Sequence, residues 1–298
     1  MTNINRHYLI NDFIDYIKYI RKYSKHTIRS YSYDLDDYYQ YFINNSKKEF
    51  LELDHIFIRS YLQHVTKSNL NAKTLARRLA TLKSFYKYIF NNNHLKVNVA
   101  KFIRAPKTNS ELPHYLTIKE IERVLNLPVG DNLKALRERL ILQLFYVTGM
   151  RLSELIKIKI IDLNLEECVI RIMGKRKKER IVIYGDDTKQ TIDKYINTLD
   201  NNIYLFPALR NIANNKHISS KTVYNIVKKY LKIVSNNEKL SPHSLRHTFA
   251  THMLDRGADI LAIKKLLGHS SLSSTQIYTH LQPEKIKKIY DKAHPHSK

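Results

Sequence analysis

The chain has 298 residues, of which 43% are hydrophobic and 26% charged, a composition typical of a folded protein. It carries 51 Lys and Arg against 27 Asp and Glu, a formal net charge of +24 at pH 7. Residues 1–110 hold 19 basic and 8 acidic residues. Residues 111–298 hold 32 basic and 19 acidic residues, so both parts are strongly basic. Nucleic acid is the leading candidate partner, and a merely solvated basic surface is the alternative.

The cysteine content and the apolar runs exclude several classes of protein. Cys168 is the only cysteine, which excludes a disulfide framework and a thiolate metal cluster. The first residues, MTNINRHYLINDF, lack the apolar core of a signal peptide, and no apolar run approaches the ~20 residues that span a bilayer. We therefore expect a cytoplasmic protein without a membrane partner.

Residues 1–105 are expected to form an all-helical domain. Apolar residues at helical spacing predict a first helix reaching Ile20, a second capped by Ser24 and continuing to about Ile43, a third over about 54–65 and a fourth over about 71–90. The stripes expected to face the core are Leu9, Phe13, Ile14, Ile17 and Ile20 in the first helix, and Leu75, Leu79, Leu82, Phe85, Tyr86 and Ile89 in the fourth.

The fourth helix carries a basic face opposite its apolar stripe. Such a helix can pack on its own bundle while it lies along a DNA groove. For any one of these side chains, a solvated position is nearly as good an explanation. The candidates for DNA contacts in this domain are Lys25, His26, Arg29, Lys73, Arg77, Arg78 and Lys83.

A linker and a second domain follow. Residues 106–113 lie in RAPKTNSELP, which has two prolines and no apolar periodicity, so we expect an extended linker before a domain spanning 114–298. Thr117 is placed to cap a helix, with Glu120 at the position that completes a capping box.

A nearly all-round apolar helix over 135–148 should form the centre of the second domain and stop at Gly149. Arg151 follows at the entrance to the next helix, where a buried guanidinium needs an anion or a carboxylate. Glu154, three residues later, could supply the carboxylate. A β-hairpin is predicted next, with strands over about 169–173 and 181–183 and the basic tip GKRKK between them.

The segment from Ser241 to Tyr278 has two predicted helices, each with a cap and a glycine stop. Ser241 begins the first, with Pro242 in its first turn, and Gly257 ends it; Asp259 begins the second and Gly268 ends it. A short third helix should start after Ser273 or Ser274 and carry Tyr278. The buried stripes are expected to be Leu245, Phe249, Ala250, Met253 and Leu254 in the first helix, and Ile260, Ile263, Leu266 and Leu267 in the second.

The polar residues of this segment are suited to chemistry on a phosphate. His243 and Arg246 are three residues apart and share one face of their helix, His269 follows Gly268, and Tyr278 comes nine residues later. A guanidinium binds phosphate oxygens, an imidazole donates hydrogen bonds to them and a phenol can attack the phosphorus. His243 and His247 could also suggest a metal pair, but nothing completes such a site, so no metal is predicted.

The sequence resembles the tyrosine recombinases, and most closely the Xer-type site-specific recombinases. The pieces that carry the resemblance are TGMRLSEL, GKRKKER, HSLRHTFATHML and LLGHSSLSSTQIYTH, with KTLARRLATLKSFYKYI in the N-terminal part. The resemblance implies a mainly α fold, with a helical core-binding domain and a mixed α+β catalytic domain that contains a small antiparallel sheet. It assigns the catalytic set Arg151, Lys175, His243, Arg246, His269 and Tyr278.

The resemblance also implies a mechanism. Tyr278 would attack the scissile phosphate and form a 3′-phosphotyrosyl link, while Arg151 and Arg246 hold the non-bridging oxygens. His269 would donate to the same oxygens, His243 would position the group or accept the phenol proton, and Lys175 would protonate the leaving 5′-oxygen. Lys177 or Lys178 could compete with Lys175, because the family more often has a small residue after the first lysine. No metal, cofactor or ATP is implied.

Partners and alternatives follow from the same resemblance. Four protomers of one chain, or of two paralogues, would assemble on two double-stranded DNA sites, clamp the DNA between their two domains and exchange C-terminal tails. A DNA translocase could activate the assembly. The expected role is resolution of chromosome or plasmid dimers, with an integrase or transposase of a mobile element, a type IB topoisomerase or a non-catalytic DNA-binding protein as alternatives. The target sequence and the choice of partner stay open.

Overall fold

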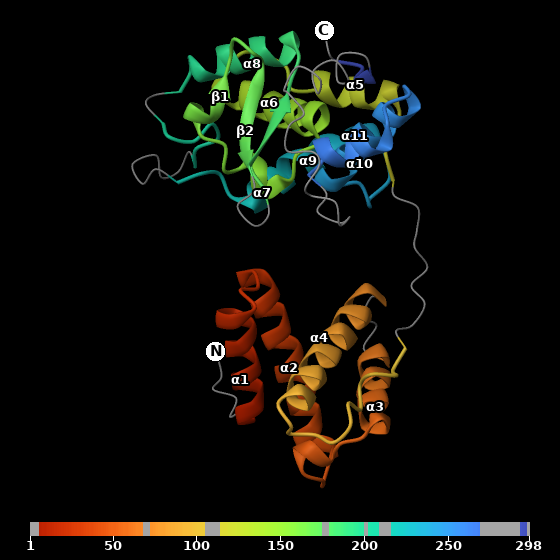
Figure 1. The fold of residues 1–298 in the computed structure, drawn as a ribbon. Coiled ribbons are helices and arrows are strands. Elements are labelled where there is room, and N and C mark those ends of the chain that lie inside the picture. Colours follow the sequence, from red (N-terminus) through yellow and green to blue (C-terminus); the bar gives the residue numbers. More distant parts are fainter. Residues whose placement is uncertain are drawn as a thin grey trace. The chain divides into compact units, whose positions relative to one another are not determined.

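The structure is a computed structural model that describes residues 6–67, 72–104, 114–174, 179–199, 202–208, 216–268 and 293–296. The chain divides into two compact units, Met1–Glu111 and Leu112–Lys298 (Figure 1). Each unit has a hydrophobic core of its own. Of the described helices, none is both long and apolar enough to cross a membrane.

The N-terminal unit is a bundle organised around its last long helix. That helix, α4, contacts α1, α2 and α3. Its apolar residues at positions 75, 79, 82, 85, 86 and 89 are all buried, as the sequence predicted. The helices are α1 (Tyr8–Asp15), α2 (Lys25–Asn45), α3 (His55–Lys67) and α4 (Ala72–Asn91), with a π-helical turn at Tyr16–Ile20 and a 3₁₀ turn at Phe50–Glu52.

The π-helical turn corrects one residue of the first predicted stripe. Leu9, Phe13 and Ile17 are buried, but Ile20 is 71% exposed. A π turn holds more residues than an α turn, so Ile20, the last residue of this turn, no longer follows the 3.6-residue spacing. The predicted cap of α2 is confirmed, because the Ser24 hydroxyl accepts from the backbone N–H of Thr27.

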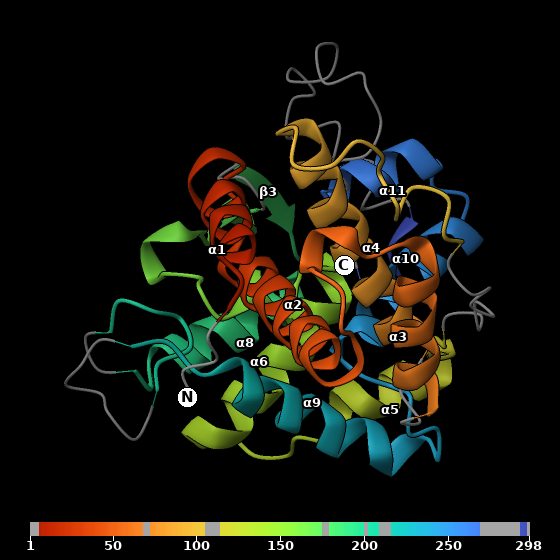
Figure 2. The same cartoon turned by 90° about the horizontal axis from the view of Figure 1, so that it is seen from below.

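The C-terminal unit packs its helices around α6, as expected of an apolar central helix. This helix contacts α5, α7, α8, α9 and α10 as well as strand β3, and in Figure 1 it lies behind the sheet. Figure 2 shows α9 beside α5, with which it is in contact. The helices are α5 (Ile118–Asn126), α6 (Leu133–Thr148), α7 (Leu152–Leu155), α8 (Asp186–Ile196), α9 (Ser220–Val234), α10 (Pro242–Asp255) and α11 (Ile260–Leu266), with a 3₁₀ turn at Ile160–Asp162.

The sheet of this unit is antiparallel, in the order β1 (Leu163–Asn164), β2 (Val169–Met173) and β3 (Glu179–Ile183). The hairpin β2–β3 was predicted, and in the structure Ile170 pairs with Val182 and Met173 with Glu179. The short β1 and the helices α8 and α9 were not predicted. Their sequences carry fewer motifs than the segment around α10, and no stripe was assigned to them.

Local capping signals were the most reliable part of the prediction for this unit. Thr117 and Glu120 form the expected capping box of α5, and Asp259 caps α11. Two apolar positions were wrong: Leu254 is 43% exposed and Ile260 52% exposed. Both lie at the ends of their helices, α10 and α11, where a residue of the stripe extends past the packed core.

The predicted interdomain linker, the helix carrying Tyr278 and most of the C-terminal tail lie outside the described residues. In the described part of the tail, Ala293 and His294 are buried in the C-terminal unit. The His294 ring lies 5.0 Å from that of Tyr146 and 5.5 Å from that of Phe249, between ring centroids. These contacts are within one chain, whereas exchange of the tail between protomers stays a prediction.

Gly149 and Gly257 provide a matched test of the packing at the end of α6. Both have positive φ, +58° and +80°, so alanine is strained at either position. A Cβ atom on Gly149 would lie 2.6 Å from Phe249 Cδ1 and 2.7 Å from Leu267 Cδ2, whereas a Cβ on Gly257 meets nothing within 4 Å. We expect Gly149→Ala to lower the free energy of unfolding by about 2–4 kcal/mol and Gly257→Ala by about 1 kcal/mol. Urea denaturation of both variants checks this, and equal losses would contradict it.

Candidate active site

The first segment of the site is the turn between α6 and α7. Gly149 ends α6 in the left-handed conformation, and the chain turns so that Arg151 becomes the N-terminal cap of α7. The Arg151 backbone N–H donates to Glu154 Oε2 at 2.7 Å and its Nη1 donates to Oε1 at 3.0 Å. The Arg151 side chain is 34% exposed, so its guanidinium is held on one side and open to solvent on another.

The second segment is the N-terminal part of α10. Ser241 and Ser244 form its capping box, and Pro242 lies in its first turn. Arg246 is 6% exposed: its Nη1 donates to the Gly149 carbonyl at 2.5 Å and its Nη2 to the Leu267 carbonyl at 2.6 Å. His243, three residues earlier on the same helix, is exposed to solvent.

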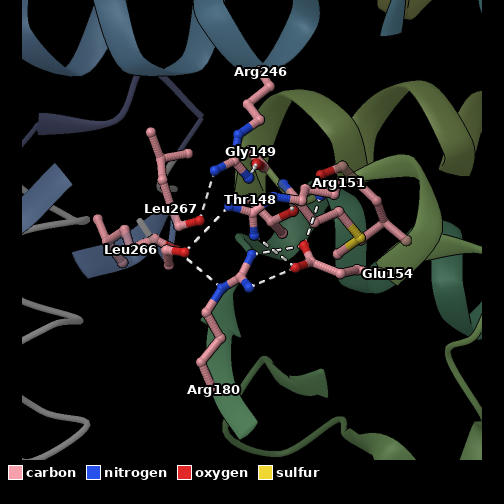
Figure 3. Close-up of polar contacts among 11 residues, drawn as sticks. Thr148, Gly149, Arg151, Glu154, Arg180, Arg246, Leu266 and Leu267 are labelled. Carbon is pink, nitrogen blue, oxygen red and sulfur yellow. Dashed lines mark hydrogen bonds and ion pairs between the residues drawn. The ribbon is translucent and has the colours of Figure 1, made fainter. Parts of the chain in front are cut away.

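The third segment joins β3 to the end of α11 (Figure 3). Arg180 of β3 donates from Nη1 and Nη2 to the two carboxylate oxygens of Glu154, each at 2.8 Å. Its Nε donates to the Leu266 carbonyl at 3.1 Å. Glu154 is buried, so its carboxylate is enclosed by the two guanidiniums that it accepts from.

The charges of the site shift the pKa of its members. Burial, together with Arg151 and Arg180, lowers the pKa of Arg246 to about 10. Burial raises the pKa of the Glu154 carboxyl, but the hydrogen bonds from Arg180 and Arg151 outweigh this and the net shift is downward. Partial desolvation of the His243 ring, together with the nearby His247, Arg246 and Arg151, lowers the pKa of His243 although the residue lies at the surface. The carboxylate is therefore ionised and the imidazole neutral at pH 7.

This arrangement is suited to binding an anion. The cluster contains three guanidiniums and one carboxylate, so it keeps a net positive charge. Arg151 and Arg246 bind the adjacent carbonyls of Gly268 and Leu267, and His243 lies three residues before Arg246 on α10. Among the described residues, no group of three or more His, Cys, Asp or Glu is placed to hold a metal ion.

Three of the six predicted catalytic residues lie outside the described residues. They are Lys175, His269 and Tyr278. For Lys175 and His269 the preceding residue is described: Gly174 follows the end of β2, and Gly268 has a φ of +63° directly before His269. The Gly268 carbonyl accepts from Arg151 Nη2 at 3.2 Å. The structure thus brings Arg151, His243 and Arg246 together beside the segment that leads to His269.

The candidate DNA-contacting residues of the N-terminal unit differ in exposure. Lys25, His26, Arg29 and Lys73 are exposed, and Arg77 and Lys83 are half-buried. Arg77 also forms an ion pair with the buried Asp34.

Arg78 serves the interior of the bundle instead. It is 6% exposed, and its guanidinium donates to the Tyr61 hydroxyl at 2.7 Å and to Asp37. It lies on the same helix as the basic face, but its position falls next to the buried stripe. A DNA contact from Arg78 would require this network to open, so we remove it from the candidates.

Arg180 is the residue of this site that sequence reasoning missed. In the sequence it is the last residue of GKRKKER, after the predicted basic tip GKRKK and before the predicted second strand, and no role was assigned to it. A signal was present nonetheless. A carboxylate has about four acceptor positions, and a buried Glu154 needs more donors than Arg151 alone can supply.

Known proteins resemble this chain in sequence and in fold. Residues 114–285 match the phage integrase family, and residues 10–93 match the N-terminal SAM-like domain of phage integrases. The chain is 38% identical to the tyrosine recombinase XerC of Thermodesulfovibrio yellowstonii over 300 residues, which is 99% of this chain and 98% of the relative. It is 33% identical to the tyrosine recombinase XerD of Staphylococcus epidermidis, over 96% of this chain and 98% of the relative.

Solved structures share the fold. The XerH site-specific recombinase bound to its difH substrate, in a post-cleavage complex, matches with a TM-score of 0.72 and 22% identity, over 95% of this chain and 84% of that one. A lambda integrase dimer bound to a core site matches with a TM-score of 0.70 and 18% identity, over 91% of this chain and 98% of that one.

Proposed function

We propose that this chain, which belongs to the phage integrase family of tyrosine recombinases, cuts and rejoins DNA at specific sites through a covalent bond between Tyr278 and a 3′-phosphate. The proposal is supported above all by the convergence of Arg151, Arg246 and His243 beside the end of α11, ten to twelve residues before Tyr278 in the sequence. A protein that only binds DNA would not need this constellation.

The two arginines would stabilise the phosphate as its charge grows in the transition state. Arg246 is buried and fixed by the carbonyls of Gly149 and Leu267, so it needs little reorganisation when DNA binds. Arg151 is the more exposed of the two and keeps one edge for a phosphate oxygen. Together they provide two positive charges at the reacting group, and the proposal assigns no step to a metal, a cofactor or ATP.

The remaining roles complete a balanced phosphoryl transfer. The Tyr278 hydroxyl oxygen forms a bond to phosphorus as the bond to the 5′-oxygen breaks. The phenol proton passes to His243, which is neutral at pH 7, and Lys175 protonates the leaving 5′-oxygen. His269 donates to a non-bridging oxygen. Reversal with a new 5′-hydroxyl rejoins the strands, and the phosphotyrosyl bond conserves the energy of the phosphodiester.

The N-terminal unit would bind the duplex through exposed basic residues. Lys25, His26 and Arg29 occupy the first turns of α2, and Lys73 and Lys83 lie on α4, where Arg77 could also take part. Phosphate contacts of this kind position a protein on DNA and make its affinity dependent on salt.

Assembly and biological role are inferred from the relatives. The XerH and lambda integrase structures hold DNA, and lambda integrase is seen as a dimer and as a tetramer on a Holliday junction. We infer a tetramer on two DNA sites, of this chain alone or with a paralogue, in the cytoplasm. The Xer relatives at 33–38% identity favour resolution of chromosome or plasmid dimers, with a translocase as a candidate activator.

Nicked suicide duplexes that contain candidate recombination sites test the covalent step. We expect the wild type to give a protein–DNA adduct that survives denaturation, with the protein on the 3′ end, because the nicked fragment diffuses away after cleavage. Tyr278→Phe removes the nucleophilic oxygen and should give no adduct. Gel electrophoresis under denaturing conditions measures both.

A binding variant provides the control for this assay. Lys25→Ser/Arg29→Ser should weaken DNA binding and lower its salt dependence, yet form the adduct at the wild-type rate when DNA is saturating. A Tyr278→Phe protein that still forms the adduct, or a wild type that binds the duplex and never cleaves it, even with a candidate paralogue added, would contradict the proposal.

The proton-accepting role of His243 predicts a particular pH dependence. The pKa of His243 lies below its ordinary value of 6.5, mainly because the side chain is partly desolvated, so the neutral form predominates at pH 6.5. At subsaturating DNA the cleavage rate should fall in acidic solution with a midpoint below pH 6.5. His243→Gln should lose about 10²–10⁴-fold in rate and show no such fall. A midpoint above pH 6.5, or the same fall in the variant, would contradict the role.

A further inference from the structure

Arg180 connects three parts of the proposed site that are far apart in the sequence. It lies on β3, five residues after Lys175. Its Nη atoms bind the Glu154 carboxylate, which holds Arg151, and its Nε binds the carbonyl of Leu266 at the end of α11, three residues before His269. One guanidinium thus links the hairpin, the α6–α7 turn and the end of α11.

The position of Arg180 separates it from the groups that would touch DNA. Its side chain is 14% exposed, and each of its three nitrogens donates a hydrogen bond within the protein. Arg151, in contrast, is 34% exposed. Arg180 is therefore placed to act through its neighbours rather than on the phosphate.

Three successive carbonyls at the end of α11 each receive a different arginine. Leu266 accepts from Arg180, Leu267 from Arg246 and Gly268 from Arg151 (Figure 3 labels Leu266, Leu267 and the three arginines). The last carbonyls of a helix have no partner inside the helix, and positive charge is favourable there. When Arg151 turns toward a phosphate and releases the Gly268 carbonyl, the contacts of Arg180 and Arg246 would keep this segment in place.

Arg180 also sets how firmly Glu154 holds Arg151. Its planar fork occupies both carboxylate oxygens, a geometry that lysine cannot reproduce. Arg151 shares the same two oxygens through one side-chain and one backbone hydrogen bond. Without Arg180, the buried carboxylate would have Arg151 as its remaining cationic partner among the described residues and would draw it away from the phosphate.

The backbone at Gly268 is fitted to this side chain. A Cβ atom there would lie 2.9 Å from Arg180 Nη1, and φ is +63°. A residue with a side chain at position 268 would have to displace the guanidinium.

We infer that Arg180 is a positioning residue that holds Arg151, the Lys175 hairpin and the segment before His269 in one arrangement. The inference rests on the proposed function, because it takes Lys175, Arg151 and His269 as members of the catalytic site.

Arg180→Lys and Arg180→Gln test the inference on a nicked duplex that the wild type cleaves. Both should bind this duplex within about threefold of wild type, since Arg180 does not face DNA. At saturating DNA the single-turnover cleavage rate should fall about 10–100-fold, because a misplacement of about 1 Å at a reacting group has that effect. Arg180→Lys, which keeps the charge without the fork, allows the test even if Arg180→Gln does not fold.

Arg139→Gln is the matched control. Arg139 also donates to main-chain carbonyls, those of Pro128 and Gly130, but near the start of α6 rather than at its end. The Arg139→Gln variant should cleave the nicked duplex at the wild-type rate. Circular dichroism and thermal unfolding confirm that each variant compared is folded.

Two modified duplexes separate positioning from a general loss of structure. A 5′-bridging sulfur leaves without needing a proton, so it should reduce the defect if Arg180 orients the Lys175 hairpin. A methyl group in place of a non-bridging oxygen removes charge, so it should reduce the defect if Arg180 orients Arg151. Relief on either duplex supports the inference. A wild-type rate in both folded variants, or an equal loss on all three duplexes, overturns it.

The outcome is distinguishable from failure of the proposed function. If the wild type gives no Tyr278-dependent adduct on any duplex, the proposed function fails, and the inference about Arg180 falls with it. If the wild type gives the adduct and the folded Arg180 variants cleave equally fast, the inference alone is wrong.

Discussion

The C-terminal unit depends on one buried carboxylate. Glu154 lies between the guanidiniums of Arg151 and Arg180, and its burial would not be tolerated without them. Removing a carboxylate from water is costly, and only several well-directed donors offset that cost. Arg151 from the α6–α7 turn and Arg180 from strand β3 both donate to Glu154, and Arg180 also binds the end of α11. These three segments therefore meet at one point.

The same interaction leaves the site with an excess of positive charge. Arg246 has no carboxylate partner among the described residues, and it rests instead on two main-chain carbonyls. Its lowered pKa, about 10, shows the combined effect of burial and of the neighbouring arginines. A phosphate diester would relieve this repulsion, so the unliganded site already favours the binding of a phosphate diester.

The sequence predicted local features well and tertiary ones poorly. Capping boxes, glycine stops and the apolar stripe of α4 depend on near neighbours, and Thr117, Gly149 and Leu79 were assigned correctly. The pairing of Arg151 with Glu154 was also foreseen, because the two are three residues apart. Arg180, 26 residues from Glu154, carried no local signal for its partner. Burial of Arg78 was missed for a similar reason, since its acceptors Tyr61 and Asp37 come from other helices.

A double-mutant cycle on single-turnover cleavage tests most directly whether Glu154 and Arg180 act as one unit. The rate at saturating nicked duplex is measured for wild type, Glu154→Gln, Arg180→Gln and the double variant. If the two residues hold the same arrangement, the double variant should be about as slow as the slower single variant, because the second change removes nothing further. Losses that multiply would show that the residues act independently and would contradict this account.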